Sequence, residues 1–295
     1  MSSKVYFTRT ISPGTVIEMY DKLGVTLPGK VACKVHSGEA GNQNFLRPEF
    51  WKPVIDHVGG HVVECNTAYA GERNETEKHK KVLYKHGWTH YFDVDLMDEQ
   101  KPDMVLEIPN GKQLKRNYVG SSIKNYDSML VLSHFKGHPM GGFGGALKQL
   151  SIGCASSEGK AYIHSAGFTT DKYNHWDHNP GQDPFLESMA DAAGSVVKYF
   201  DGKMAFITIM CNISVDCDCC AVAEDPCMKD IGILASLDPI AIDQAAIDFA
   251  YAATDDPGQA HFLERVESRH GVHTIEVAAE LGFGSREYEL IDLDK

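Results

Sequence analysis

Short hydrophobic runs alternate with amphipathic segments through the first hundred residues of the chain. The hydrophobic runs are rich in β-branched and aromatic residues, as strands are, and they lie at 5–10, 30–36 and 61–66. The amphipathic segments have helical periodicity and begin at about Pro13, about Pro48 and about Asn74. The second is expected to end at His57 and the third at about His86. Strands that alternate with helices predict a mainly parallel sheet covered by helices.

The middle of the chain is richer in strand patterns. Hydrophobic runs at 104–109 and 113–120 flank Asn110-Gly111, a pair typical of tight hairpin turns, and a longer apolar run follows at 128–135. We therefore expect a hairpin that is attached to the sheet.

The last third returns to a helix–strand pattern, with a helix at 184–200 and strands at 204–210 and 230–236. A further helix is expected to begin at Asp238-Pro239, because Asp caps helix N-termini and Pro suits the first helical position.

These patterns together predict an α/β fold class, with a mainly parallel or mixed sheet flanked by helices and a hairpin addition in the middle of the chain. We expect a single α/β domain over 1–295. The alternative is two lobes, at about 1–135 and 136–295, with the site between them.

The composition and net charge indicate a folded protein that does not bind nucleic acid. Hydrophobic residues make up 43% and charged residues 23% of the 295 positions, as in folded globular proteins. The net charge is -13 and no basic run supplies a phosphate-binding patch, which argues against a nucleic-acid partner. The densest basic group, at 78–81, has Glu75 and Glu77 beside it and is interpreted as a solvated helix face.

No targeting or membrane segment is recognisable. The N-terminal residues lack the apolar run of a signal peptide, and no stretch approaches the ~20 apolar residues that span a bilayer. The sequence therefore predicts a cytoplasmic protein without a membrane partner, in which clustered cysteines bind metal or do redox work more often than they form structural disulfides. Homo-oligomerisation is left open.

Five of the eight cysteines fall within 211–227, on a loop interrupted by Asp and Pro residues. Thiolate is the soft ligand preferred by iron–sulfur clusters and by zinc, so both cofactors are candidates. The spacing matches neither the paired two-residue gaps of zinc sites nor the ferredoxin run. Unligated thiols and a disulfide-exchange pair are the alternatives.

A glycine-rich segment at 133–153 follows the longer apolar run. Ligands of open α/β sheets bind beyond the carboxyl ends of strands, where glycines let the backbone approach and helix N-termini favour anions. Lys136, His138 and Lys148 lie beside this turn, so an anionic ligand is predicted. The segment has neither the Walker nor the dinucleotide spacing, and a flexible turn with solvated lysines is the alternative.

Two further segments carry candidate binding groups. The segment at 67–79 connects a predicted strand to a predicted helix and contains Thr67, Arg73 and His79. Arg73 and Thr67 could bind a carboxylate or phosphate. An Asn-capped helix with exposed charges is the alternative. The histidines of the HWDH segment at 175–178 could converge on a metal, although short loops of this kind are usually solvated.

Several dispersed motifs together resemble the DUF362 family of uncharacterised iron–sulfur-centre proteins. The motifs are TAYAGERNETEKH at 67–79, FKGHPMGGFGGALKQLSIGCASSEGK at 135–160, and CDCCAVAEDPCMKDIGILASLDPIAIDQAAID at 217–248. The resemblance extends from about Val5 to Ala250. Many members carry an inserted ferredoxin-like domain after the segment that corresponds to GCASSEGK, and this chain lacks it.

The resemblance implies an iron–sulfur cluster, of the 4Fe-4S type, with zinc as the alternative. The cysteines of the GCAS and CDC motifs recur in the family and match Cys154, Cys217 and Cys219 here. Cys227 is the expected fourth ligand, with Cys220 or Cys211 as its alternatives.

The leading functional hypothesis is an iron–sulfur oxidoreductase that passes electrons to or from a small anionic substrate or a redox partner protein. Lys136 and His138 would be catalytic, His138 as proton donor, while Lys148, Arg73, Thr67 and His79 would bind the substrate. The alternatives are a non-redox lyase or hydratase at an open cluster iron, a cluster sensor or electron-transfer module, a zinc-stabilised α/β enzyme, and a nucleotide-type or nickel-type cofactor at the glycine loop.

Overall fold

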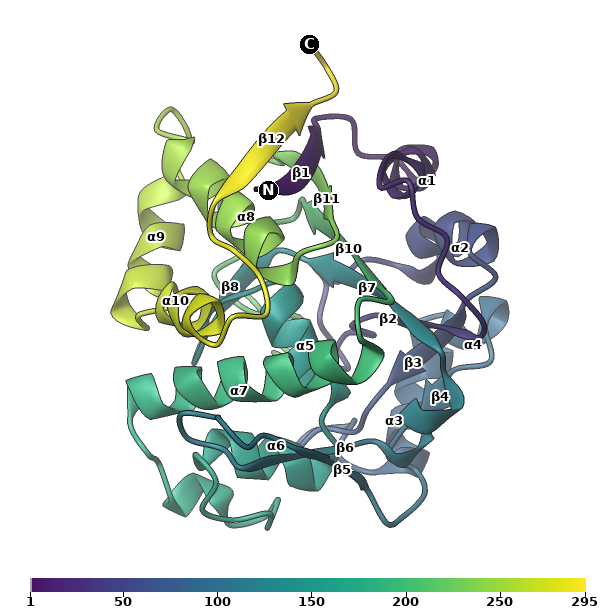
Figure 1. Ribbon diagram of the computed structural model, residues 1–295, viewed down its shortest axis with the longest axis vertical. Coiled ribbons are helices and arrows are strands. Elements are labelled where there is room, and N and C mark those ends of the chain that lie inside the picture. The colour runs from purple at the N-terminus through teal and green to yellow at the C-terminus, as the bar shows by residue number, and fades with distance from the viewer. Residues whose placement is uncertain (1) are drawn as a thin grey trace.

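An eight-stranded mixed sheet forms the centre of the computed structural model, which describes residues 2–295 (Figure 1). In order across the sheet, the strands are β12 (Tyr288–Asp292), β1 (Ser3–Thr8), β11 (Gly232–Ser236), β10 (Met204–Met210), β7 (Ser128–His134), β2 (Val31–Lys34), β3 (His61–Glu64) and β4 (Asp95–Leu96). The five strands from β10 to β4 are mutually parallel. β11 is antiparallel to both of its neighbours, and β12 pairs in parallel with β1.

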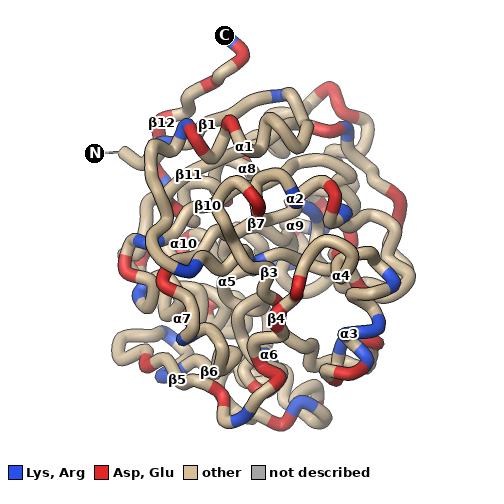
Figure 2. Tube along the Cα trace, turned by 90° about the vertical axis from the view of Figure 1, so that its right-hand side faces the viewer, with Lys and Arg blue, Asp and Glu red and all other residues tan. Residues whose placement is uncertain are grey.

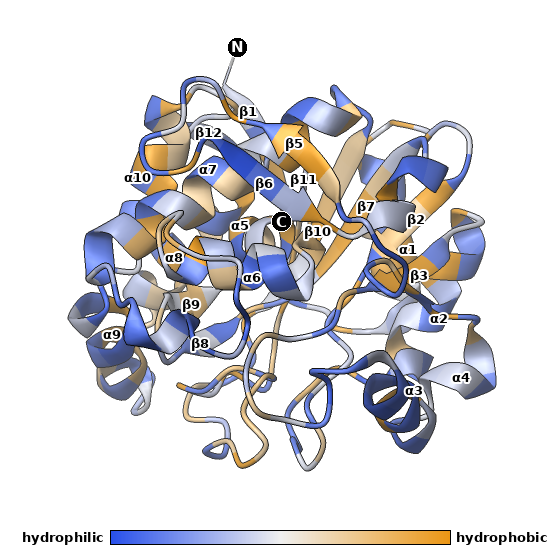
Figure 3. Ribbon diagram, turned by 90° about the horizontal axis from the view of Figure 1, so that it is seen from below, coloured by the Kyte–Doolittle hydropathy of each residue, from blue (hydrophilic) through white to orange (hydrophobic). Residues whose placement is uncertain are grey.

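Helices cover both faces of this sheet. One face is covered by α1 (Pro13–Lys22), α2 (Pro48–His57), α3 (Thr76–Lys85) and α4 (Trp88–Tyr91). The other carries α5 (Ala146–Cys154), α6 (Ser157–His164), α7 (Gln182–Phe200), α8 (Pro239–Ala252), α9 (Gln259–Ser268) and α10 (His273–Glu280). Figure 3 shows the hydrophobic central strands between these layers.

The predicted α/β class and mixed sheet are confirmed by this architecture. Helix α2 begins and ends where the sequence pattern places it. The Asp238 cap is also confirmed, because its carboxylate accepts hydrogen bonds from the backbone N–H groups of Ile240 and Ala241 at 2.8 and 3.1 Å.

The predicted hairpin forms, but it is not attached to the large sheet. β5 (Met104–Glu107) and β6 (Arg116–Val119) make a separate two-stranded sheet that packs on α6 and α7. Its turn is held by the carboxylate of Asp191 in α7, which accepts backbone N–H groups of residues 112–114 at 2.7–2.9 Å. Asp191 therefore fixes the hairpin to the helical layer. The strand pattern of the hairpin does not reveal this contact with a helix.

Several elements have no counterpart in the sequence prediction. β8 (Lys136–His138) and β9 (Gly142–Gly144) are three residues each, too short to show alternation. α5 is buried on almost every side, so it lacks the one-sided apolar pattern that marks a surface helix.

The exposed charges of α3 confirm the interpretation of the basic group at 78–81. Lys78 and Lys80 lie 3.4 Å from Glu75 and Glu77, and both signs of charge occur side by side on this helix in Figure 2. Within residues 2–295 there is also no helix with the length and apolar character needed to cross a membrane.

The strand order reverses between β2 and β7. From β2 the chain proceeds outward through β3 to β4, whereas β7 is followed on its other side by β10. Connections diverge at such a point and leave a crevice beyond the carboxyl ends of the strands, which is where open α/β sheets bind ligands. The residues after β2, β3, β7 and β10 are therefore brought together there.

Candidate metal and anion site

Three side chains from two of these strand ends meet at the crevice. The ligand atoms of His138, in β8, and of Cys217 and Cys219, in the loop after β10, all lie within 4.8 Å of one another. The His138 Nε2 to Cys219 Sγ distance is 3.9 Å. Nitrogen and sulfur ligands on one tetrahedral Zn²⁺ would be about 3.6 Å apart, and two sulfur ligands about 3.8 Å apart. The spacing of the three ligand atoms is therefore close to that of a single metal site.

The thiol of Cys217 is surrounded by hydrogen-bond donors. Lys148 Nζ and the backbone N–H of Cys219 each lie 3.4 Å from Cys217 Sγ. Burial alone would raise the pKa of Cys217, but hydrogen bonding with Cys219 and the Lys148 ammonium together hold that pKa well below its usual range. The pKa of Cys219 is raised, because its hydrogen bond to Cys217 keeps it protonated. These opposite shifts favour ionisation of Cys217 over Cys219.

His138 is oriented by its own turn. Its Nδ1 accepts hydrogen bonds from the backbone N–H groups of Met140 and Gly141 at 3.2 and 2.8 Å. Burial lowers the pKa of His138, so the ring is neutral and its proton lies on Nε2, facing the sulfur atoms. A metal ion at Nε2 must displace this proton, and the turn at 139–141 must then release Nδ1.

A buried aspartate fixes the CDC segment independently of any cofactor. The Asp218 carboxylate lies 3.0 Å from His134 Nδ1 and 2.9 Å from Lys136 Nζ. Although burial opposes ionisation, these two groups hold the pKa of Asp218 below its usual range. Between Lys136 and His138, Gly137 leaves room for the cysteine loop, since a Cβ there would lie 2.2 Å from the Val215 carbonyl oxygen.

Side-chain amides hold the cysteine loop from its other side. Asn42 Nδ2 donates to the Cys220 carbonyl at 2.9 Å, Gln43 Nε2 to the Ala223 carbonyl at 2.7 Å, and Asn44 Nδ2 to the Glu224 carbonyl at 2.8 Å. Three consecutive residues after β2 therefore replace the regular backbone pairing that this loop lacks.

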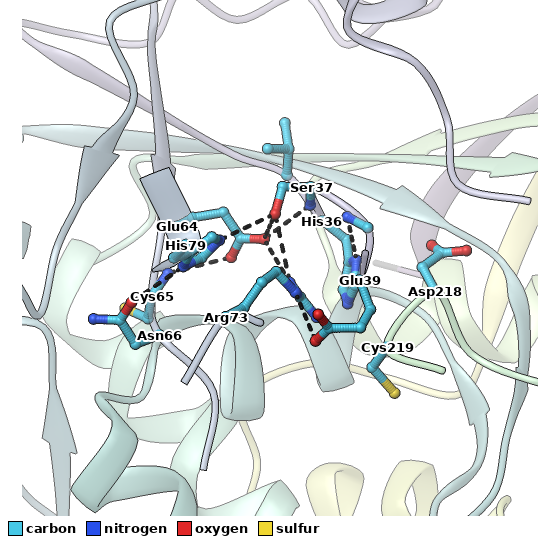
Figure 4. A network of polar contacts seen from close by, with 12 residues as sticks. His36, Ser37, Glu39, Glu64, Cys65, Asn66, Arg73, His79, Asp218 and Cys219 are labelled. Atoms are coloured by element: carbon cyan, nitrogen blue, oxygen red, sulfur yellow. Dashed lines mark hydrogen bonds and ion pairs between the residues drawn. The ribbon is translucent and has the colours of Figure 1, made fainter. Parts of the chain in front are cut away.

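A buried network of charges lies next to the cysteines (Figure 4). Lys34 Nζ is 2.7 Å from Glu64, and the Arg73 guanidinium is 3.3 Å from Glu39 and 3.6 Å from Glu64. Burial opposes ionisation of Glu64, but Lys34 and the neighbouring His36 and Arg73 hold its pKa well below the usual range. His79 contacts Ser37 Oγ at 3.3 Å behind this network.

A cavity of about 240 Å³ opens between these groups. Its cationic lining residues are Lys34, Arg73, Lys148 and Lys160, and Glu64 is the acidic lining residue among those described. His138 and Cys219 lie in the same wall. The candidate metal position therefore adjoins a cavity whose charges favour an anion.

The N-terminus of α5, which the glycine-rich segment leads into, is already filled. The Asp243 carboxylate accepts the backbone N–H groups of Ala146 and Leu147 at 2.7 and 2.9 Å. A Cβ at Gly145 would lie 2.3 Å from this carboxylate. The glycine thus admits an internal aspartate at the position where an external anion was expected.

Among the predicted metal ligands, Cys217 and Cys219 are brought together and two others lie elsewhere. Cys154 is at the end of α5, where its Sγ is 3.7 Å from the Gln149 carbonyl oxygen. Cys227 Sγ is 3.4 Å from the Ile213 carbonyl oxygen. Within residues 2–295 neither belongs to the group of three ligand atoms that lie within 4.8 Å of one another, so the roles of Cys154 and Cys227 as cluster ligands stay predictions.

The remaining predicted residues divide between the cavity and its support. His138, Lys148, Arg73 and Thr67 line the cavity, whereas Lys136 and His79 are not among its lining residues. Of the two alternative cysteines, Cys220 lines the cavity and Cys211 packs in the opposite face of the sheet. Trp176 of the HWDH segment lies at the cavity, with its ring 5.3 Å from that of His164.

The sequence analysis did not identify several residues of the site. These are Lys34, His36, Glu64, Lys160 and His164 in the cavity lining and Asp218 below it. Lys34, His36 and Glu64 stand at the carboxyl ends of β2 and β3, so the rule that ligands bind at strand ends could have identified them.

Comparisons with known proteins show one family. The model of a family described as a domain of unknown function, DUF362, matches residues 31–248. No curated protein matches the sequence.

Solved structures show distant similarity. The lactate racemase apoprotein from Thermoanaerobacterium thermosaccharolyticum aligns with 69% of this chain and 50% of its own, at 11% identity and a TM-score of 0.42. A structural-genomics target from Thermotoga maritima aligns with 91% of this chain and 59% of its own, at 12% identity and a TM-score of 0.41. The chain thus spans less than two thirds of either protein.

Proposed function

The chain belongs to the DUF362 family, whose description names no reaction, and we propose that it is a metal-dependent enzyme acting on a small anion. His138, Cys217 and Cys219 would bind one metal ion, and the adjoining cavity would bind the substrate. One observation carries this proposal: three ligand atoms lie within 4.8 Å of one another, and two of their residues, His138 and Cys219, line a cationic cavity.

The ligand set suggests the type of metal. One imidazole and two thiolates are borderline-soft ligands, which suit Zn²⁺ and neighbouring transition metals. Three protein ligands also leave a coordination position open, as in catalytic zinc sites. The bound ion would supply Lewis-acid polarisation of a substrate oxygen.

The protein's own residues would bind the anion and handle protons. Lys148 stabilises the Cys217 thiolate, while Lys160 and Arg73 contribute positive charge to the cavity. His164 Nδ1 donates to the Lys160 carbonyl at 2.7 Å, which leaves Nε2 free to accept. Burial lowers the pKa of His164 to about 3, so this ring is a neutral acceptor at physiological pH.

An iron–sulfur oxidoreductase is the second candidate. One observation favours it, because Cys220 lines the same cavity as Cys219 and supplies a third thiol close to Cys217. A cluster held there would use Cys217 and Cys219 together with Cys220, which the sequence analysis gives as an alternative ligand.

Metal and acid-labile sulfide analysis of anaerobically purified protein separates the two candidates. The leading proposal predicts about one zinc or other transition-metal ion per chain and no sulfide, because a mononuclear site has no inorganic sulfur. Iron and sulfide in equal amounts, several per chain, would instead support the cluster. Protein that retains no metal and takes up neither Zn²⁺ nor, with sulfide, iron would contradict both.

A further inference from the structure

Two polar groups in the cavity lack the partners that such buried groups normally have. Thr67 is 4% exposed, and its Oγ1 has no hydrogen-bond partner among residues 2–295. Lys160 is 6% exposed, and its Nζ donates to the Ala155 carbonyl at 2.6 Å and has no carboxylate at ion-pair distance in the described part of the chain. Buried charges and hydroxyls are normally paired, and both residues line the cavity, so a bound ligand could supply the missing partner.

The other cations of the cavity already have partners. Lys34 pairs with Glu64, Arg73 with Glu39 and Glu64, and Lys148 contacts the Cys217 sulfur. Lys160 is therefore the cation whose charge is least compensated. Burial lowers the pKa of Lys160 more than the neighbouring Cys65, Asp98 and Glu64 raise it, and a bound anion would oppose the effect of burial.

The cavity also has apolar lining residues. These are Ala68, Pro139, Met140, Ile152 and Trp176. Trp176 is 46% exposed, and its ring is held against His164 at a centroid distance of 5.3 Å. An exposed aromatic ring held in this way offers a preformed contact for an apolar ligand group.

We propose that the cavity binds a monocarboxylate with an apolar body, its carboxylate at Lys160 and Thr67 and its carbon skeleton against Met140, Ile152 and Trp176. One ammonium and one hydroxyl match the two oxygens and single charge of a carboxylate, whereas a phosphate dianion needs more donors. An apolar cavity of about 150 Å³ accommodates benzene. The 240 Å³ here leaves room for a six-carbon body and its carboxylate.

That the bound acid is a substrate rests on the proposed function. Binding of the acid can be tested without the metal. Trp51 and Trp88 are fully buried, so ligand-dependent changes in the fluorescence of metal-free protein report on Trp176. Hexanoate and benzoate are expected to give saturable changes with at least tenfold tighter binding than acetate. Hexylamine and inorganic phosphate are expected to give none. Trp176→Phe is expected to remove the signal and so confirm its source.

Variants assign the carboxylate contact. Lys160→Met keeps the length of the side chain and is expected to weaken hexanoate binding by at least tenfold, whereas Lys124→Met, at an exposed site, leaves it unchanged. Thr67→Val keeps the side-chain shape and is expected to weaken hexanoate binding severalfold. This variant tests the contact even if Lys160→Met does not fold.

Three results would overturn the inference: equal affinity for acetate and hexanoate, saturable binding of phosphate that competes with hexanoate, or wild-type affinity in both folded variants. Because the titration uses metal-free protein, it tests carboxylate binding alone. If the protein proves to bind no metal, the titration is unaffected. If it binds no carboxylate, the proposed metal site is unaffected.

Discussion

Replacing Cys217 with serine is expected to lower the affinity of the protein for Zn²⁺ by at least about 100-fold. The substitution removes the thiol whose pKa its surroundings hold well below the usual range, and a serine hydroxyl stays protonated at neutral pH. Loss of groups that merely orient metal ligands costs 10–100-fold, so loss of a ligand should cost at least as much. Competition between the protein and a chromophoric chelator measures the affinity.

Cys227→Ser is the matched control, because it makes the same chemical change in the same loop at a thiol outside the group of three. Its Zn²⁺ affinity should equal that of the wild type. Equal affinities of Cys217→Ser and wild type, or a loss confined to Cys227→Ser, would contradict the assignment of the ligands.

Replacing Glu64 with glutamine is expected to destabilise the protein by about 3–5 kcal/mol, the usual cost of removing one partner of a buried ion pair. Glu64 neutralises Lys34 at 2.7 Å and contributes to neutralising Arg73. Glutamine keeps the shape and the acceptor for the Ser37 N–H but leaves both cations with less compensation. Urea unfolding at pH 7 measures the difference.

The pH dependence gives this prediction a second readout. Because the folded-state pKa of Glu64 is depressed, its stabilising contribution is fully present above the unfolded pKa of about 4.3 and is lost as the pH falls. The difference between wild type and Glu64→Gln should therefore shrink in acid. Glu77→Gln, on the exposed side of α3, should cost little at any pH. A Glu64→Gln variant within about 1 kcal/mol of wild type at pH 7 would show that the network contributes little to stability.

The alternation of strand and helix patterns predicted most of the large sheet, because strands buried on both faces show near-continuous apolar runs. It did not predict that β11 is antiparallel, since a strand's direction is set by its connection and not by its composition. β12 also escaped prediction. Its residues are mostly polar or half-exposed, and it forms because β1 offers an open edge for pairing.

The sequence predicted those parts of the site that follow from a residue's type and its neighbours in the chain. Cys217 and Cys219 were predicted as ligands and His138 as catalytic, but that these three residues meet depends on the crossover between β7 and β10. Lys136 had the sequence context of a catalytic residue, whereas in the structure it is the counter-ion of Asp218. Such pairings are tertiary contacts, and the spacing of residues in the sequence does not predict them.

The most direct test of the metal site is X-ray absorption at the zinc edge of protein loaded with one equivalent of Zn²⁺. The assignment of His138, Cys217 and Cys219 predicts two sulfur ligands at about 2.3 Å and nitrogen or oxygen ligands at about 2.0–2.1 Å. The sulfur contribution should fall by half in Cys219→Ser and stay unchanged in Cys227→Ser. A shell of four sulfur ligands, or a shell without sulfur, would contradict this assignment.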